Sequence, residues 1–117
     1  MLVATLQDAD GTVLGEATHL CEGLAGAAMA DPALQARWRP LGDGLAEVTV
    51  QARTVALSVH FALEGWRAES AYFDLAPGAV RHVRLHRIAV PHSPLADSIR
   101  GCVLAANAAR PVLLQAA

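Results

Sequence analysis

The amino-acid sequence predicts an all-β fold, an antiparallel β-sandwich of about seven or eight strands. Short runs in which apolar and polar residues alternate recur along the chain, and turn residues such as Asp-Gly and Pro-Gly separate them. The chain has 117 residues, which suffices for one domain with a sizeable core. No repeat, linker or low-complexity tract divides it. We therefore expect residues 1–117 to form a single sandwich domain.

The strands are expected at regular intervals along the chain. An Asp-Gly turn in QDADG predicts an opening hairpin, and LGDG predicts a second one. The segment EGLAGAAMADPA between them could form one helical turn or a loose crossover, which Pro32 would end near Asp31. In chain order, the expected strands are residues 2–6, 12–19, 34–40, 45–52, 54–63, 79–88, 99–106 and 110–115.

The run TVALSVHFAL has the clearest period of two. One face should carry Val55, Leu57, Val59, Phe61 and Leu63, and the other Ala56, Ser58, His60 and Ala62. The second face has small side chains, which would suit packing against another domain around Ser58 and His60. A small-residue face exposed to water is the alternative.

Charge and composition exclude several function classes. The net charge is -2, and all nine basic residues are arginine, so the sequence predicts no nucleic-acid or anionic-membrane surface. No apolar run approaches the roughly 20 residues of a membrane span, and no signal peptide precedes the first alternating run. The arginine-only, alanine-rich usage is typical of a bacterial genome of high GC content. We expect a cytoplasmic or periplasmic location.

No catalytic or metal site is predicted. His82 and His86 share a strand face but would lie about 13 Å apart, too far to bind one ion. Glu64 and Glu69 lie in a loop, which on a small sandwich rarely holds two carboxyls at a glycosidase spacing. Nucleophile elbows and phosphate-binding loops are absent, so no cofactor is expected. Two cysteines, at positions 21 and 102, are either buried thiols or a disulfide.

The few aromatic residues allow two interpretations. Trp38, Trp66 and Tyr72 could form a stacking surface for a sugar, or they could fill the core. The second interpretation is favoured by SAYFDLAPG, in which Leu75 precedes a turn formed by Pro77 and Gly78. We expect Tyr72 and Phe73 to close one end of the core at this corner.

The stretch LEGWRAESAYFDLAPGAVRHVRL resembles the C-terminal immunoglobulin-like domain of β-mannosidases and related glycoside hydrolase family 2 enzymes. The resemblance rests on Glu-Gly-Trp at 64–66, Tyr-Phe at 72–73 and Leu-x-Pro-Gly at 75–78. LVATLQDADGTVLGEAT is similar to the opening hairpin of that domain, and VLAANAARPV to its closing strand. An immunoglobulin-like sandwich is the fold that the resemblance implies.

The resemblance also implies a function and partners. It predicts a non-catalytic accessory domain of a bacterial exo-glycosidase that acts on terminal β-mannosides or related β-glycosides, with the catalytic (β/α)₈ barrel elsewhere in the parent chain. The acid/base glutamate of the family follows an asparagine, whereas Asn107 is followed by Ala108, so no catalytic residue can be transferred. The expected partners are the barrel and other domains of the parent. The alternative is a carbohydrate-binding module that uses Trp66 and Tyr72, and a third possibility is an unrelated partner-binding sandwich.

Overall fold

The computed structural model describes residues 1–19, 31–88 and 99–117, and all their regular elements are β-strands. The predicted all-β sandwich is confirmed. None of the described residues forms a helix that could span a membrane. The eleven described strands are β1 (Leu2–Gln7), β2 (Val13–His19), β3 (Gln35–Gly42), β4 (Leu45–Gln51), β5 (Ala56–Leu63), β6 (Trp66–Ala68), β7 (Phe73–Leu75), β8 (Val80–Arg87), β9 (Gly101–Leu104), β10 (Val112–Leu113) and β11 (Gln115–Ala116).

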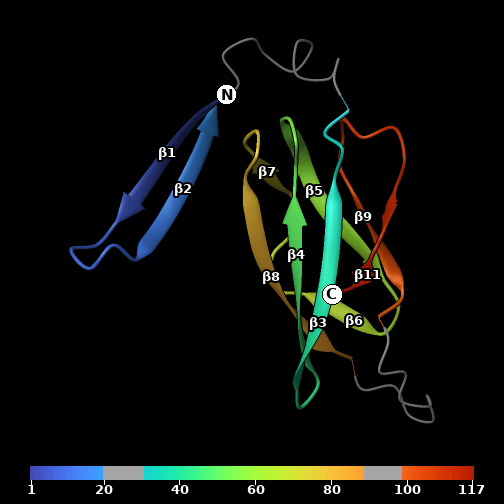
Figure 1. Ribbon diagram of the computed structural model, residues 1–117. Helices are drawn as coiled ribbons and strands as arrows, with labels where there is room; N and C mark the ends of the chain where they lie inside the picture. The colour runs from blue at the N-terminus through green and yellow to red at the C-terminus, as the bar shows by residue number, and fades with distance from the viewer. Residues whose placement is uncertain (20–30, 89–98) are drawn as a thin grey trace.

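Two sheets face each other, and the β1–β2 hairpin stands beside them (Figure 1). One sheet has four strands in the order β10-β9-β5-β7, and the other has five in the order β11-β3-β4-β8-β6. All pairings are antiparallel except that between β11 and β3. There are more strands than predicted because each of two segments contributes one strand to each sheet. The 110–115 run gives β10 and β11, and the loop after β5 gives β6 and β7.

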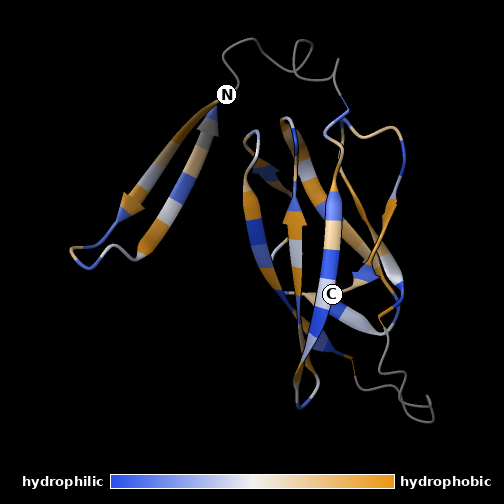
Figure 2. Ribbon diagram, viewed as in Figure 1, coloured by the Kyte–Doolittle hydropathy of each residue, from blue (hydrophilic) through white to orange (hydrophobic). Residues whose placement is uncertain are grey.

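The core lies between the two sheets. β4 buries every second side chain along its length, whereas β3 does so only at Ala36 and Trp38, and β8 only at Val83 and Leu85. Figure 2 shows the corresponding alternation of hydrophobic and hydrophilic residues along these strands. Each buried Val or Leu contributes about 1.5–3 kcal/mol relative to an exposed one. The five-stranded sheet buries Ala36, Trp38, Ala46, Val48, Val50, Val83 and Leu85, and the four-stranded sheet buries Ala56, Val59, Phe73, Leu75 and Val103.

A β-bulge interrupts β5 and breaks the predicted alternation. The register with β7 shifts between Ala56 and Val59, and both of these residues are fully buried in the core. Leu57 and Ser58 together lie opposite the single residue Asp74, so β5 has one extra residue here, and Ser58 has a φ of 51°. The prediction for Ala56, which was expected on the small-residue face, is therefore wrong. Ser58 lies half-buried in the bulge, whereas His60 keeps its outward position.

The predicted corner forms as a tight turn. Pro77 and Gly78 occupy its centre, Gly78 has a φ of 75°, and the Ala79 N–H donates to the Ala76 carbonyl at 3.0 Å. These features define a type II turn, in which the positive φ requires glycine. The Gly78 N–H also donates to the Ala52 carbonyl at 2.8 Å, which ties the turn to the end of β4.

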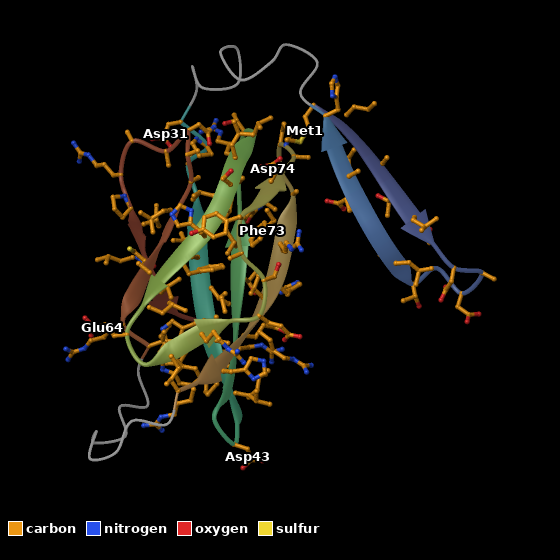
Figure 3. All side chains as sticks on the ribbon, turned by 180° about the vertical axis from the view of Figure 1, so that it is seen from behind. Met1, Asp31, Asp43, Glu64, Phe73 and Asp74 are labelled. Carbon is orange, nitrogen blue, oxygen red and sulfur yellow. The ribbon has the colours of Figure 1, made fainter. Side chains whose placement is uncertain are left out.

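Of the two aromatic residues before the corner, one is buried and the other is exposed. Phe73 is buried between the sheets, as predicted, and Figure 3 shows it inside the body of the sandwich. Tyr72 is 73% exposed, so the prediction that it closes the core is wrong. Its backbone is left-handed, with a φ of 59°, and its ring stacks on His60 at the surface.

The β1–β2 hairpin contributes no residue to the core of the sandwich. The Asp8 carboxylate accepts hydrogen bonds of 2.9 Å from the Asp10 and Thr12 N–H groups, which confirms the predicted acidic turn. The predicted crossover and the pairing of Cys21 with Cys102 fall on residues 20–30, outside the described part of the chain.

Leu85→Ala should lower the free energy of unfolding by about 2–5 kcal/mol, because it leaves a cavity at the centre of the core. Urea denaturation followed by circular dichroism would measure it. Val80→Ala, on the same strand but half exposed, should stay within about 0.5 kcal/mol of the original chain. Equal losses in both variants would contradict the assigned core.

Candidate functional site

The most distinctive surface of the sandwich is the outer face of its four-stranded sheet. The β5–β9 register places His60 opposite Leu104 and Ala62 opposite Cys102, and the β10–β9 register places Leu113 opposite Cys102. Cross-strand partners share a face of a sheet. Val103, which alternates with Cys102 and Leu104, is buried in the core. We define the outer face as His60, Ala62, Tyr72, Cys102, Leu104 and Leu113.

None of these six residues is an aspartate, glutamate, lysine or arginine, and two of their side chains project into solvent. Charged residues lie around them on the same side of the sheet: Asp74, between buried Phe73 and Leu75, and Glu64 opposite Arg100. Leu113 is 72% exposed, and Tyr72 is exposed to a similar degree. Ala62 is also exposed, whereas Cys102 and Leu104 are half-buried. A contiguous surface that combines apolar side chains with an exposed tyrosine is typical of protein contact sites.

Tyr72 and His60 form a stacked aromatic pair at one end of the outer face. Their ring centroids are 5.0 Å apart and the rings are inclined by 17°. The Tyr72 N–H donates to the Val59 carbonyl at 2.7 Å, which fixes the left-handed residue against β5. A non-glycine residue in this region costs on the order of 1–3 kcal/mol.

The hydrogen bond of His60 defines its tautomer. Nδ1 lies 2.8 Å from the Ser58 carbonyl oxygen. Because a carbonyl oxygen only accepts, Nδ1 carries the hydrogen, and Nε2 of the neutral ring is then an acceptor. The pair therefore offers a flat tyrosine face and an imidazole acceptor at the surface.

Two polar side chains outside β5 hold the bulge that positions this pair. The Asp74 carboxylate accepts from the Ser58 N–H at 2.9 Å. The Asn107 side chain accepts from the Leu57 N–H at 2.9 Å and donates to the Val55 carbonyl at 2.7 Å. These side-chain hydrogen bonds replace the strand-to-strand hydrogen bonds that the N–H groups of Leu57 and Ser58 would make in a regular sheet. Sequence reasoning missed both roles, because their partners lie 16 to 52 residues away along the chain.

Arg81 closes the same end of the sandwich from the other sheet. Its guanidinium carbon lies 4.3 Å from the centroid of the Phe73 ring, and its Nη2 donates to the Ser70 hydroxyl at 3.4 Å. A cation over an aromatic face contributes about 0.5–2 kcal/mol. Arg81 therefore covers one face of the buried Phe73 ring.

The three candidate sugar-stacking residues do not form one surface. Trp38 is 9% exposed and belongs to the core, on the inner side of the five-stranded sheet. Trp66 lies half-buried on β6 and packs against the core. Tyr72 alone presents its ring to solvent.

The outer face of the five-stranded sheet carries paired charged and polar side chains. Arg39 and Glu47 form an ion pair of 3.2 Å, and His82 Nδ1 lies 3.0 Å from the Thr49 hydroxyl. His86 approaches Glu69 at 3.4 Å on the same side. Among the described residues, no group of three or more His, Cys, Asp or Glu side chains is arranged to hold a metal ion.

Comparison of the chain with protein-family models, with curated proteins and with solved structures finds no match.

Asn107→Ala should lower the free energy of unfolding by about 1–3 kcal/mol, because it leaves a partly buried N–H and a carbonyl of β5 without partners. Urea denaturation would measure the change, with Gln51→Ala, at an exposed position on β4, as the control. If the two variants unfolded at the same urea concentration, the bulge would not depend on Asn107.

Proposed function

We propose that this chain is a non-catalytic packing module of a larger glycosidase, which contacts a neighbouring domain through the outer face of its four-stranded sheet. The observation that carries this proposal is the group of apolar side chains in the middle of that face, with Leu113 and the Tyr72 ring exposed to solvent. Burial of such side chains against a partner is favourable, at about 25 cal/mol per Å² of apolar area.

The contrast between the two sheets supports this assignment. The five-stranded sheet turns arginine, glutamate and histidine side chains outward, and their pairs are accessible to water. Exposed ion pairs of this kind contribute little to stability but keep a surface hydrated. The outer face of the five-stranded sheet is thus suited to contact with water, and that of the four-stranded sheet to contact with a partner.

Tyr72 is the best candidate for the anchor of this contact. Its left-handed backbone costs free energy, and its exposed ring contributes no core burial within the described chain. Tyrosine is enriched among residues that dominate binding energy at protein interfaces. The stack on His60 limits the motion of the ring before a partner arrives.

The identity of the larger enzyme is proposed from the resemblance at residues 64–78. An immunoglobulin-like accessory domain of a bacterial β-mannosidase or related glycoside hydrolase family 2 enzyme fits the corner turn and the buried Phe73. The partners would be the catalytic barrel and other domains of the parent chain, which would hydrolyse terminal β-mannosides or related β-glycosides. This chain would supply no catalytic residue.

Leu113→Asp in the parent enzyme should lower the melting temperature of the assembly while kcat for a nitrophenyl glycoside stays within about twofold, because a charge would be buried at the interface. In the isolated chain the same substitution should change stability by about 0.5 kcal/mol or less. Gln51→Asp, on the other sheet, is the matched control. A parent enzyme unaffected by Leu113→Asp would argue against this packing face, and hydrolysis by the isolated chain would exclude a non-catalytic role.

The alternative function, carbohydrate binding, is favoured by the exposed Tyr72 ring and the acceptor nitrogen of His60. Isothermal titration calorimetry of the isolated chain with manno-oligosaccharides separates the two functions. A packing module should give no saturable heat. Saturable binding that Tyr72→Ala abolishes and Trp66→Ala leaves intact would instead assign a sugar site at the stacked pair.

A further inference from the structure

The β1–β2 hairpin has an apolar face that nothing in the described chain covers. Cross-strand pairing places Leu2, Ala4, Leu6, Gly15, Ala17 and His19 on one face, which we call the outer hairpin face. Leu2 and Leu6 are 62% and 63% exposed. Figure 2 shows hydrophobic residues along both strands. An isolated two-stranded hairpin is marginally stable in water, so a partner that covers this face would stabilise it.

The opposite face of the hairpin is turned towards its own sandwich. Val3, Val13 and Glu16 line one side of a hollow of about 290 Å³, and residues 74–76 and 79–81 of the β7–β8 corner line the other. Val3 is also less exposed than either leucine of the outer hairpin face. The outer hairpin face therefore points away from the sandwich and is accessible to a second molecule.

We infer that the outer hairpin face packs against the same face of a second copy of the chain. The face has no aspartate, glutamate, lysine or arginine. Leucines lie at both ends of β1, Ala4, Gly15 and Ala17 lie between and beside them, and His19 lies opposite Leu2. Two copies can therefore approach closely at the centre of the face without burying a carboxylate or a guanidinium. A twofold arrangement uses the same patch on both subunits and stops at a dimer.

The acidic turn determines which twofold arrangement is favoured. Asp8 and Asp10 lie at one end of the hairpin, and residues 1–19 contain no lysine or arginine. Two hairpins with their turns together would place like charges side by side, whereas antiparallel hairpins separate them. In the antiparallel arrangement Leu2 of one copy meets Leu6 of the other, and the two Ala4 residues meet at the axis. His19, at the end opposite the turn, then lies near the partner's acidic turn, to which its imidazole can donate a hydrogen bond.

The contact is small, which sets the expected affinity. A stable interface usually buries about 800 Å² per partner, and a face of six residues buries less. The dimer should thus form only as the concentration rises from low micromolar towards millimolar. This inference does not depend on the function proposed above, because it uses a different surface.

Sedimentation velocity of the full chain over that concentration range tests the inference. The average mass should rise towards that of a dimer, and Leu6→Asp should weaken association by about tenfold or more. Val13→Asp, on the inner face of the same hairpin, should leave association unchanged. A chain that stays monomeric throughout, or a dimer that survives Leu6→Asp, would overturn the inference.

Crosslinking tests the geometry even if Leu6→Asp unfolds the hairpin. Facing sheets pack about 10 Å apart, too far for a disulfide, so a short bismaleimide is the suitable reagent. In a background with Cys21→Ser and Cys102→Ser, the Ala4→Cys chain should crosslink several times faster than the Thr5→Cys chain, whose residue lies on the inner face. Equal rates would contradict the twofold contact.

Discussion

The bulge in β5 is the constraint on which both the core and the candidate interface depend. By adding one residue between Ala56 and Val59, it allows both of them to enter the core while His60 still points outward. A regular strand would send one of the two buried residues to the surface, since side chains alternate strictly. The bulge persists because its backbone groups bond to Asp74 and Asn107. Core packing on one side of β5 and the stacked pair on the other therefore share the same two polar supports.

The two outer faces of the sandwich expose different kinds of side chain. Paired arginine, glutamate and histidine side chains keep the five-stranded sheet hydrated. The middle of the four-stranded sheet exposes apolar side chains and a strained tyrosine, and its charged residues, Asp74, Glu64 and Arg100, lie around them. This difference between the two faces supports the proposed contact with a partner.

Regular features were predictable from the sequence, and features fixed by distant contacts were not. The period of two in β3, β4 and β8 and the Pro77-Gly78 turn follow from local patterns. The bulge could not be predicted, because it depends on side chains far from β5 in sequence. The exposure of Tyr72 could not be predicted either, because the residue that covers the Phe73 ring is Arg81, which belongs to the other sheet. The candidate site was therefore predicted only in part, as an outward His60 on a face of small side chains.

The start of β7 links the interior of the sandwich to its surface. Phe73 is fixed by the core and by Arg81, so the backbone of its neighbour has little freedom to relax. The bond from the Tyr72 N–H to the Val59 carbonyl holds that neighbour in its left-handed conformation. Glycine would adopt this conformation without strain, but it would lack the ring that stacks on His60. Since the ring is exposed and adds no core burial, folding of this chain gives no evident reason to prefer tyrosine here, whereas contact with a partner does.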